Sequence, residues 1–227
     1  MNSIRIAAVA DVHSPRFLKE FTRSLKLCRT PDLFLLAGDI VNRGAAKEYP
    51  RVLEAIDRIH GDIPIVACFG NEEYPASRNE ILSLVEDRVT FLDESSTSLI
   101  ISGRKVGIVG ASVLLEQSQS AQEGINDQHS RIKHAFEKRA LRISQHLQKL
   151  VNTVQHAILL LHYSPLSEES SEFSWWISKA LESVRPTLIV HGHVHTSTNH
   201  KVVIGAIPVY NVALPAVGRI TELSLND

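Results

Sequence analysis

Residues 4–13 read IRIAAVADVH, a β-like apolar run that ends in two polar side chains, Asp11 and His13. Four later runs end in the same way, and the polar residues behind them are, in chain order, Asp39 after 33–37, Asn71 after 65–69, His162 after 157–161, and His193 with His195 after 188–190. The carboxyl ends of parallel strands meet at one edge of a sheet, so these side chains are expected to converge. Their carboxylate, amide and imidazole groups are metal ligands, and the pattern therefore predicts a metallo-enzyme site.

The segments between the first runs have the spacing of amphipathic helices. Apolar residues recur with helical periodicity over 16–28, 46–59 and 77–85, each behind a strand-like run. Alternating strands and helices predict a parallel sheet with helices packed on it.

The middle of the chain changes character. Runs 97–101 and 105–109 are joined by Ser102-Gly103-Arg104, which predicts a hairpin. A Ser- and Gln-rich stretch, 116–127, has no apolar periodicity and is expected to form a surface loop. The α/β pattern then resumes, with helices expected over 128–152 and 173–184 and short strands over 202–204, 208–212 and 220–225. Two packed sheets flanked by helices would accommodate both halves.

Composition narrows the class of protein. A chain of 227 residues, 44% of them hydrophobic, can bury the core of a single domain, expected to span 1–227. The formal net charge of −1 argues against a nucleic-acid partner, and no apolar run approaches the ~18 residues that a membrane helix needs. The two cysteines, Cys28 and Cys68, do not suggest a disulfide framework. We expect a cytoplasmic, soluble protein that acts on small molecules, in an oligomeric state that the sequence does not indicate.

Each polar motif is weak alone, because Asp-x-His, Gly-Asp and His-x-His also occur in turns and on surfaces. Their joint order is specific. The series Asp11-x-His13, Gly38-Asp39, Gly70-Asn71-Glu72, His162 and Gly192-His193-x-His195 resembles the signature of the calcineurin-like metallophosphoesterase superfamily, and it covers residues 11–195. The resemblance implies an α/β fold of four layers, an α/β/β/α sandwich of two mixed sheets flanked by helices, with a dinuclear metal site at the strand ends.

The resemblance also assigns the metal ligands. It implies that one divalent ion is held by Asp11, His13, Asp39 and His195, and the other by Asp39, Asn71, His162 and His193. Asp39 would then bridge the two ions, together with a shared hydroxide. Two divalent cations, two aspartates and one hydroxide leave a charge of about +1, which attracts a phosphoryl group.

The donor set indicates which metals fit. Imidazole, carboxylate and amide groups without a thiolate suit Mn²⁺ or Fe, and they tolerate Zn²⁺ or Ni²⁺. Two-metal sites with ions ~3.5–4 Å apart stabilise both the attacking and the leaving oxygen of an in-line displacement. The expected activity is hydrolysis of a small phosphodiester, nucleotide or phosphomonoester by in-line attack of the metal-bridging hydroxide.

Four residues are candidates for direct roles in catalysis: Asp39, Asn71, Glu72 and Arg43. Arg43 resembles an arginine with which the family's protein phosphatases grip phosphate oxygens, although a plain surface arginine is the alternative. Glu72 stands where the family signature has a histidine that can protonate the leaving group. This departure implies a different acid, a narrower substrate range or lost activity, but related families with cysteine or arginine at the same place remain phosphodiesterases.

Two interpretations compete with a small-molecule phosphoesterase. One is a non-catalytic scaffold, like the family's retromer subunit, and the other is a nuclease. The complete set of metal ligands favours an enzyme over a scaffold, whereas the near-neutral charge disfavours a nuclease. We also expect the segment 116–127, with the start of the following helix, to lie near the metal-bearing face and to help select the substrate, because strand-end loops carry function.

Overall fold

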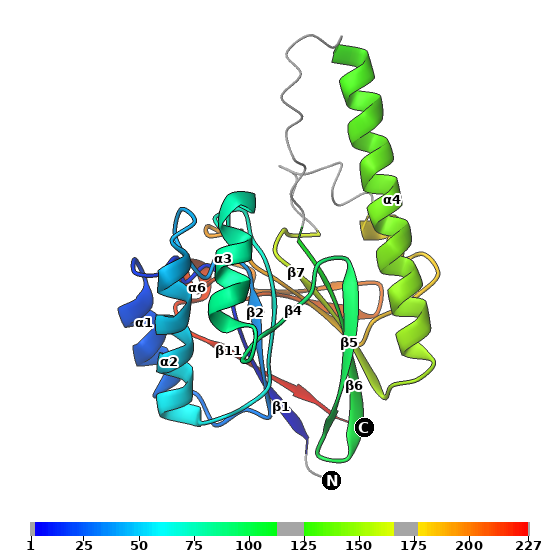
Figure 1. Cartoon of the computed structure of the whole chain (residues 1–227). Coiled ribbons are helices and arrows are strands. Elements are labelled where there is room, and N and C mark those ends of the chain that lie inside the picture. The colour runs from blue at the N-terminus through cyan, green and yellow to red at the C-terminus, as the bar shows by residue number, and fades with distance from the viewer. Residues whose placement is uncertain (1–2, 113–124, 166–176, 227) are drawn as a thin grey trace.

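The computed structural model describes residues 3–112, 125–165 and 177–226. Two β-sheets lie face to face, and helices cover the outer face of each (Figure 1). This four-layer arrangement of two mixed sheets confirms the predicted fold.

The first sheet contains five strands. In order across the sheet they are β11 (Thr221–Leu225), β1 (Ile4–Val9), β2 (Leu33–Ala37), β3 (Ile65–Cys68) and β4 (Thr90–Phe91). β11 runs antiparallel to β1, and the other neighbouring pairs are parallel. The carboxyl ends of β1, β2 and β3 therefore lie at the same edge of the sheet.

The second sheet contains six strands. In order they are β5 (Ser95–Ile101), β6 (Arg104–Ala111), β7 (His156–Leu161), β8 (Leu188–His191), β10 (Ile207–Asn211) and β9 (Lys201–Ile204). β5 and β6 form the predicted antiparallel hairpin, and β9 pairs antiparallel with β10. The remaining neighbours are parallel, so β7 and β8 also end at one edge.

The helices fall into two groups. On the first sheet lie α1 (Leu18–Leu25), α2 (Tyr49–His60), which follows a 3₁₀ turn (Ala46–Glu48), and α3 (Pro75–Val85), while α4 (Ile125–Val151) packs on the second sheet (Figure 1). Residues 177–181 are helical, and α6 (Leu214–Val217) joins β10 to β11. None of the helices in the described part of the chain combines the length and the apolar character that a membrane crossing requires.

The central strands are buried on both faces, which explains their unbroken apolar sequences. In β1, Val9 packs towards the helices, whereas Ile6 and Ala8 face the second sheet. In β2, Leu36 packs towards the helices and Leu35 faces the second sheet, as the two-residue period of a strand requires. A third apolar cluster lies between the second sheet and its helices.

Several predicted boundaries differ from the structure. The helix expected over 16–28 begins only at Leu18, because Arg16 and Phe17 form a turn whose N–H groups donate to the carbonyls of His13 and Val12. The helix expected over 46–59 starts as a 3₁₀ turn, and α2 begins at Tyr49 with Pro50 in its first turn, where a missing N–H costs nothing.

The loop expected over 116–127 extends too far at its end. Residues 125–127 belong to α4. Residues 116–124 lie outside the described part of the chain, and so do residues 173–176 of the helix expected over 173–184.

Candidate metal centre

The polar residues identified at the strand ends come together in two groups. Asp11, His13 and His195 form the first group, and Asp39, His162 and His193 form the second. Within each group, one ligand atom from every residue lies within 4.8 Å of the others. Asp11 and His13 follow β1, Asp39 follows β2, and the remaining histidines follow β7 and β8, so both sheets contribute to each group.

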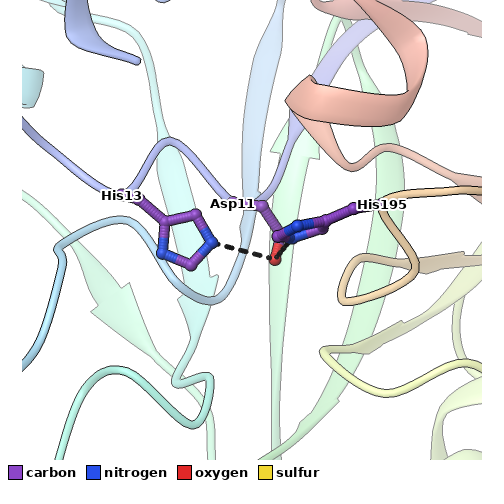
Figure 2. Close-up of side chains that lie close together, drawn as sticks. All are labelled: Asp11, His13 and His195. Atoms are coloured by element: carbon purple, nitrogen blue, oxygen red, sulfur yellow. Dashed lines mark hydrogen bonds and ion pairs between the residues drawn. The ribbon is translucent and has the colours of Figure 1, made fainter. Parts of the chain in front are cut away.

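The first group is arranged around the Asp11 carboxylate (Figure 2). His195 Nε2 lies 2.9 Å from Asp11 Oδ1, and His13 Nε2 lies 3.7 Å from the same oxygen. The other carboxylate oxygen, Oδ2, accepts a hydrogen bond of 2.9 Å from the backbone N–H of His193. Asp11 is completely buried, so its oxygens are fixed in direction by these contacts.

The second group is arranged around His162. The Nδ1 of this buried imidazole donates to the carbonyl oxygen of Ala37 at 2.9 Å, which directs Nε2 into the site. Nε2 lies 3.0 Å from Asn71 Oδ1 and 3.5 Å from Asp39 Oδ2. Asn71 thus contacts the second group, as its place behind β3 suggested.

Asp39 lies between the two groups. Its Oδ2 is 3.9 Å from His13 Nε2 and 3.5 Å from His162 Nε2. Its Oδ1 accepts a hydrogen bond of 2.7 Å from the backbone N–H of Glu72. One oxygen of Asp39 is therefore held by the protein, and the other faces histidines of both groups.

The backbone at the site adopts an unusual conformation. Seven non-glycine residues of the described chain have positive φ angles, and four of them are Asp11, His13, Asp39 and His193. This left-handed region costs energy for residues with a Cβ, and such strain is concentrated at functional sites. The fold thus directs these four side chains into the site at the expense of stability.

Two histidines of the site have a lowered pKa, and two have a raised pKa. Burial lowers the pKa of His13 and His193, which favours the neutral imidazole that binds metal. Burial also opposes the charge of His162, but the charge and hydrogen bond of Asp39, together with Asp11 and the Ala37 carbonyl, outweigh it and raise the His162 pKa to about 9. A hydrogen bond to Asp11 raises the pKa of His195.

His13 provides the clearest sign of a cation. Its side chain is buried, and neither ring nitrogen has a hydrogen-bond partner among the described residues. Buried polar groups without partners are rare and require an explanation. Because His13 Nε2 points between the carboxylates of Asp11 and Asp39, a divalent cation bound by both would satisfy it. The residues present therefore fit a divalent metal.

Glu73 supports the site and was missed in the sequence, where it follows the ligand motif without a strand pattern of its own. It is buried, and its Oε2 accepts hydrogen bonds from the N–H groups of Asp39 at 2.8 Å and Gly70 at 2.7 Å. Its Oε1 accepts a third from Val41 at 3.0 Å. Desolvation raises the pKa of Glu73 to about 7, and the charge of Asp39 adds to this effect. Glu73 thus joins the loop behind β2 to the loop behind β3.

Asn211, at the end of β10, supports the histidine loop from the other side. Its amide Nδ2 donates to the carbonyl of Val194 at 2.8 Å, between His193 and His195. Its Oδ1 accepts from the N–H of Ala213. In the sequence, Asn211 falls inside the strand expected over 208–212, and the structure ends that strand at Asn211.

The side chain of Glu72 contacts the backbone of Arg43. Glu72 Oε2 accepts a hydrogen bond of 2.6 Å from the Arg43 N–H, so this carboxylate closes the loop behind β2. The Arg43 side chain is exposed and has no hydrogen bond or ion pair with any described residue. It remains available to bind a ligand from solution.

Comparison with known proteins agrees with this geometry. A sequence model of the calcineurin-like phosphoesterases matches residues 4–197. The chain belongs to the calcineurin-like phosphoesterase family. The matched range contains all the residues of both groups. A comparison with curated proteins finds no match.

Solved structures show the same family fold at low sequence identity. The protein TT1561 of Thermus thermophilus superimposes with a TM-score of 0.56 at 13% identity, over 99% of this chain and 100% of that one. A 5′-nucleotidase precursor from the same organism gives 0.55 at 15% identity, over 99% of this chain and 54% of that one. A phosphatase of Mycoplasma pneumoniae gives 0.53 at 14% identity, over 94% and 72%. At these identities the likeness extends to the fold alone.

Proposed function

We propose that this protein is a metal-dependent phosphoesterase that hydrolyses a small phosphodiester, nucleotide or phosphomonoester. The observation that carries the proposal is the convergence of two groups of carboxylates and imidazoles. One group contains the buried His13, whose ring nitrogens have no hydrogen-bond partner among the described residues. One divalent ion would be held by Asp11, His13, Asp39 and His195, and the other by Asp39, Asn71, His162 and His193. Oxygen and nitrogen donors without a thiolate favour Mn²⁺ or Fe, and permit Zn²⁺ or Ni²⁺.

Two divalent ions in such a site supply Lewis-acid polarisation of the phosphate and an activated water. Asp39 is the proposed bridging ligand, since its Oδ2 faces His13 and His162 while Glu72 N–H holds its Oδ1. The Nδ1–H of His162 is fixed on Ala37, which presents Nε2 as an electron-pair donor.

Two side chains would act on the substrate. Arg43 is exposed at the rim and is proposed to bind a phosphate oxygen. Asn71 would both bind metal and help to orient the phosphate. Glu72 is proposed to leave the leaving-group oxygen without a proton donor, since it stands where the family signature has a histidine. Its carboxylate accepts the N–H of Arg43.

Reconstitution of the protein tests the proposal. The purified chain, stripped with a chelator, should bind about two Mn²⁺ ions and hydrolyse bis(p-nitrophenyl) phosphate, p-nitrophenyl phosphate or a nucleotide. A protein that binds two ions and hydrolyses none of these substrates would instead be the scaffold of the same fold. Selective cleavage of DNA or RNA would identify a nuclease.

Asp39→Asn tests the bridging role. The variant should lose binding of both ions and more than about 100-fold of the activity, since even residues that only support a ligand contribute 10–100-fold to affinity. Metal analysis and turnover measure the two effects, and exposed Asp87→Asn serves as the control. Unchanged stoichiometry in Asp39→Asn would remove the bridging assignment.

A further inference from the structure

The two sheets are closed at one edge of the sandwich and open at the other. At the edge formed by β4 and β5, Leu92 is buried between the sheets. At the opposite edge, formed by β11 and by β9 with β10, the sheets leave a cavity of about 450 Å³. The last turn of α1 and the segment that leads into β11 complete its walls. The volume lies in the range of small-molecule binding sites.

Two polar atoms in the cavity walls lack partners. The Nδ1 of His200, just before β9, and the Oγ1 of Thr221, in β11, are buried and have no hydrogen-bond partner among the described residues. These residues come from opposite sheets. Both atoms are shielded from solvent, so they lie behind the surface of the cavity as unsatisfied polar groups.

The charges of the lining are unbalanced. Lys201 and Arg219 form no ion pair with any carboxylate in the described chain. The lining carboxylate, Glu222, already accepts a hydrogen bond of 3.0 Å from Arg29. Burial raises the pKa of the Cys28 thiol to about 11, so that group is neutral. The cavity therefore has two free positive charges and no free negative charge among the residues that the structure describes.

The rest of the lining is apolar or aromatic. Leu27 lies at the rim with 77% of its surface exposed, an unusual position for a leucine. Val217 and Ile220 form part of the wall, and the ring of Tyr210 lies 5.3 Å from Lys201 Nζ. The positive charges and the apolar surface occur side by side.

We propose that this edge cavity is a second binding site, which takes a small organic anion with a flat apolar body. Lys201 and Arg219 bind the carboxylate, sulfonate or phosphate group. The apolar body contacts Leu27 and Tyr210. Nothing in this site requires the metal centre or the proposed hydrolysis.

Titration with 8-anilinonaphthalene-1-sulfonate tests the proposal, because this probe combines an anionic group with a flat apolar body. Its fluorescence should report one site per full chain, and amide chemical shifts should change around Cys28, Lys201 and Thr221. The combined variant Lys201→Glu and Arg219→Glu should weaken binding more than tenfold, since charge-assisted contacts are the strongest in the site. Lys149→Glu on the exposed face of α4 is the matched control.

Two further binding measurements, with a second probe and a second variant, complete the test. The uncharged N-phenyl-1-naphthylamine should bind at least tenfold more weakly than the sulfonate. Leu27→Ser should weaken sulfonate binding without lowering the stability of the fold, because it removes apolar surface from an exposed position at the rim of the cavity. Equal affinity for the neutral probe, equal loss in Lys149→Glu, or loss of binding when a chelator removes metal would each overturn the proposal.

Discussion

The Glu73 carboxylate lies buried beside the candidate metal centre and accepts hydrogen bonds from three backbone N–H groups. Two of these belong to Asp39 and Gly70, so Glu73 sets the relative position of two ligand-bearing loops. Glu73→Gln replaces one acceptor oxygen by an NH₂ group that faces N–H donors. We expect about 1–3 kcal/mol lower stability and 10–100-fold weaker Mn²⁺ binding. Calorimetric titration measures the affinity, and equal affinity of Glu73→Gln and the exposed control Glu80→Gln would contradict the role.

We expect Glu72 to determine which leaving groups the proposed enzyme tolerates. Its Oε2 accepts the Arg43 N–H, and we expect its carboxylate to give no proton to a departing oxygen. Rates should fall steeply as the leaving-group pKa rises, and Glu72→His should accelerate poor leaving groups within the 10²–10⁴-fold range of general-acid catalysis. A series of aryl and alkyl phosphodiesters measures this dependence. A flat dependence in the unaltered protein that steepens in Glu72→Gln would show that Glu72 is itself the acid.

At the scale of elements, the sequence predicted best where apolar periodicity is strong. β1 and β2 are buried on both faces, so their apolar runs and their places in the sheet could be read directly. β4 and α6 escaped prediction, because two and four residues are too short to show a period. α4 was predicted within three residues at its start, where Asp127 is as common in a loop as in a first helical turn.

Some residues of the candidate site could be predicted from the sequence and others could not. Asp11, Asp39 and His162 could be found, because each directly follows a strand-like run. Glu73 and Asn211 could not be assigned roles, since both act through hydrogen bonds to backbone groups of distant segments. Contacts of this kind depend on how two loops meet in space, and a single sequence carries no signal for them.

The edge cavity is formed by the packing of the two whole sheets. Lys201 and Thr221 belong to different sheets, and their proximity follows only from the packing of one sheet on the other. The same packing fills the opposite edge with Leu92. No local pattern distinguishes the two edges, so this site could be recognised only in the assembled structure.

The stability of the whole molecule should depend on pH through His191, which ends β8 in the interior of the second sheet. Burial lowers its pKa from 6.5 to about 4. Between these values the unfolded chain binds a proton that the folded protein rejects, so stability is full above pH 6.5 and falls as the pH drops towards 4. The difference between the two pKa values corresponds to a decrease of about 3 kcal/mol in the free energy of unfolding.

Urea unfolding of the metal-free protein and of His191→Gln at about pH 7 and about pH 4 measures this loss. The variant carries no imidazole at this position, so its stability should fall by about 3 kcal/mol less than that of the unaltered protein over this interval. His162, whose pKa is raised to about 9, remains charged in the folded state at both pH values and acts alike in both proteins. Parallel pH profiles would show that His191 is protonated in the folded protein, and that the end of β8 is less well shielded from water than its burial indicates.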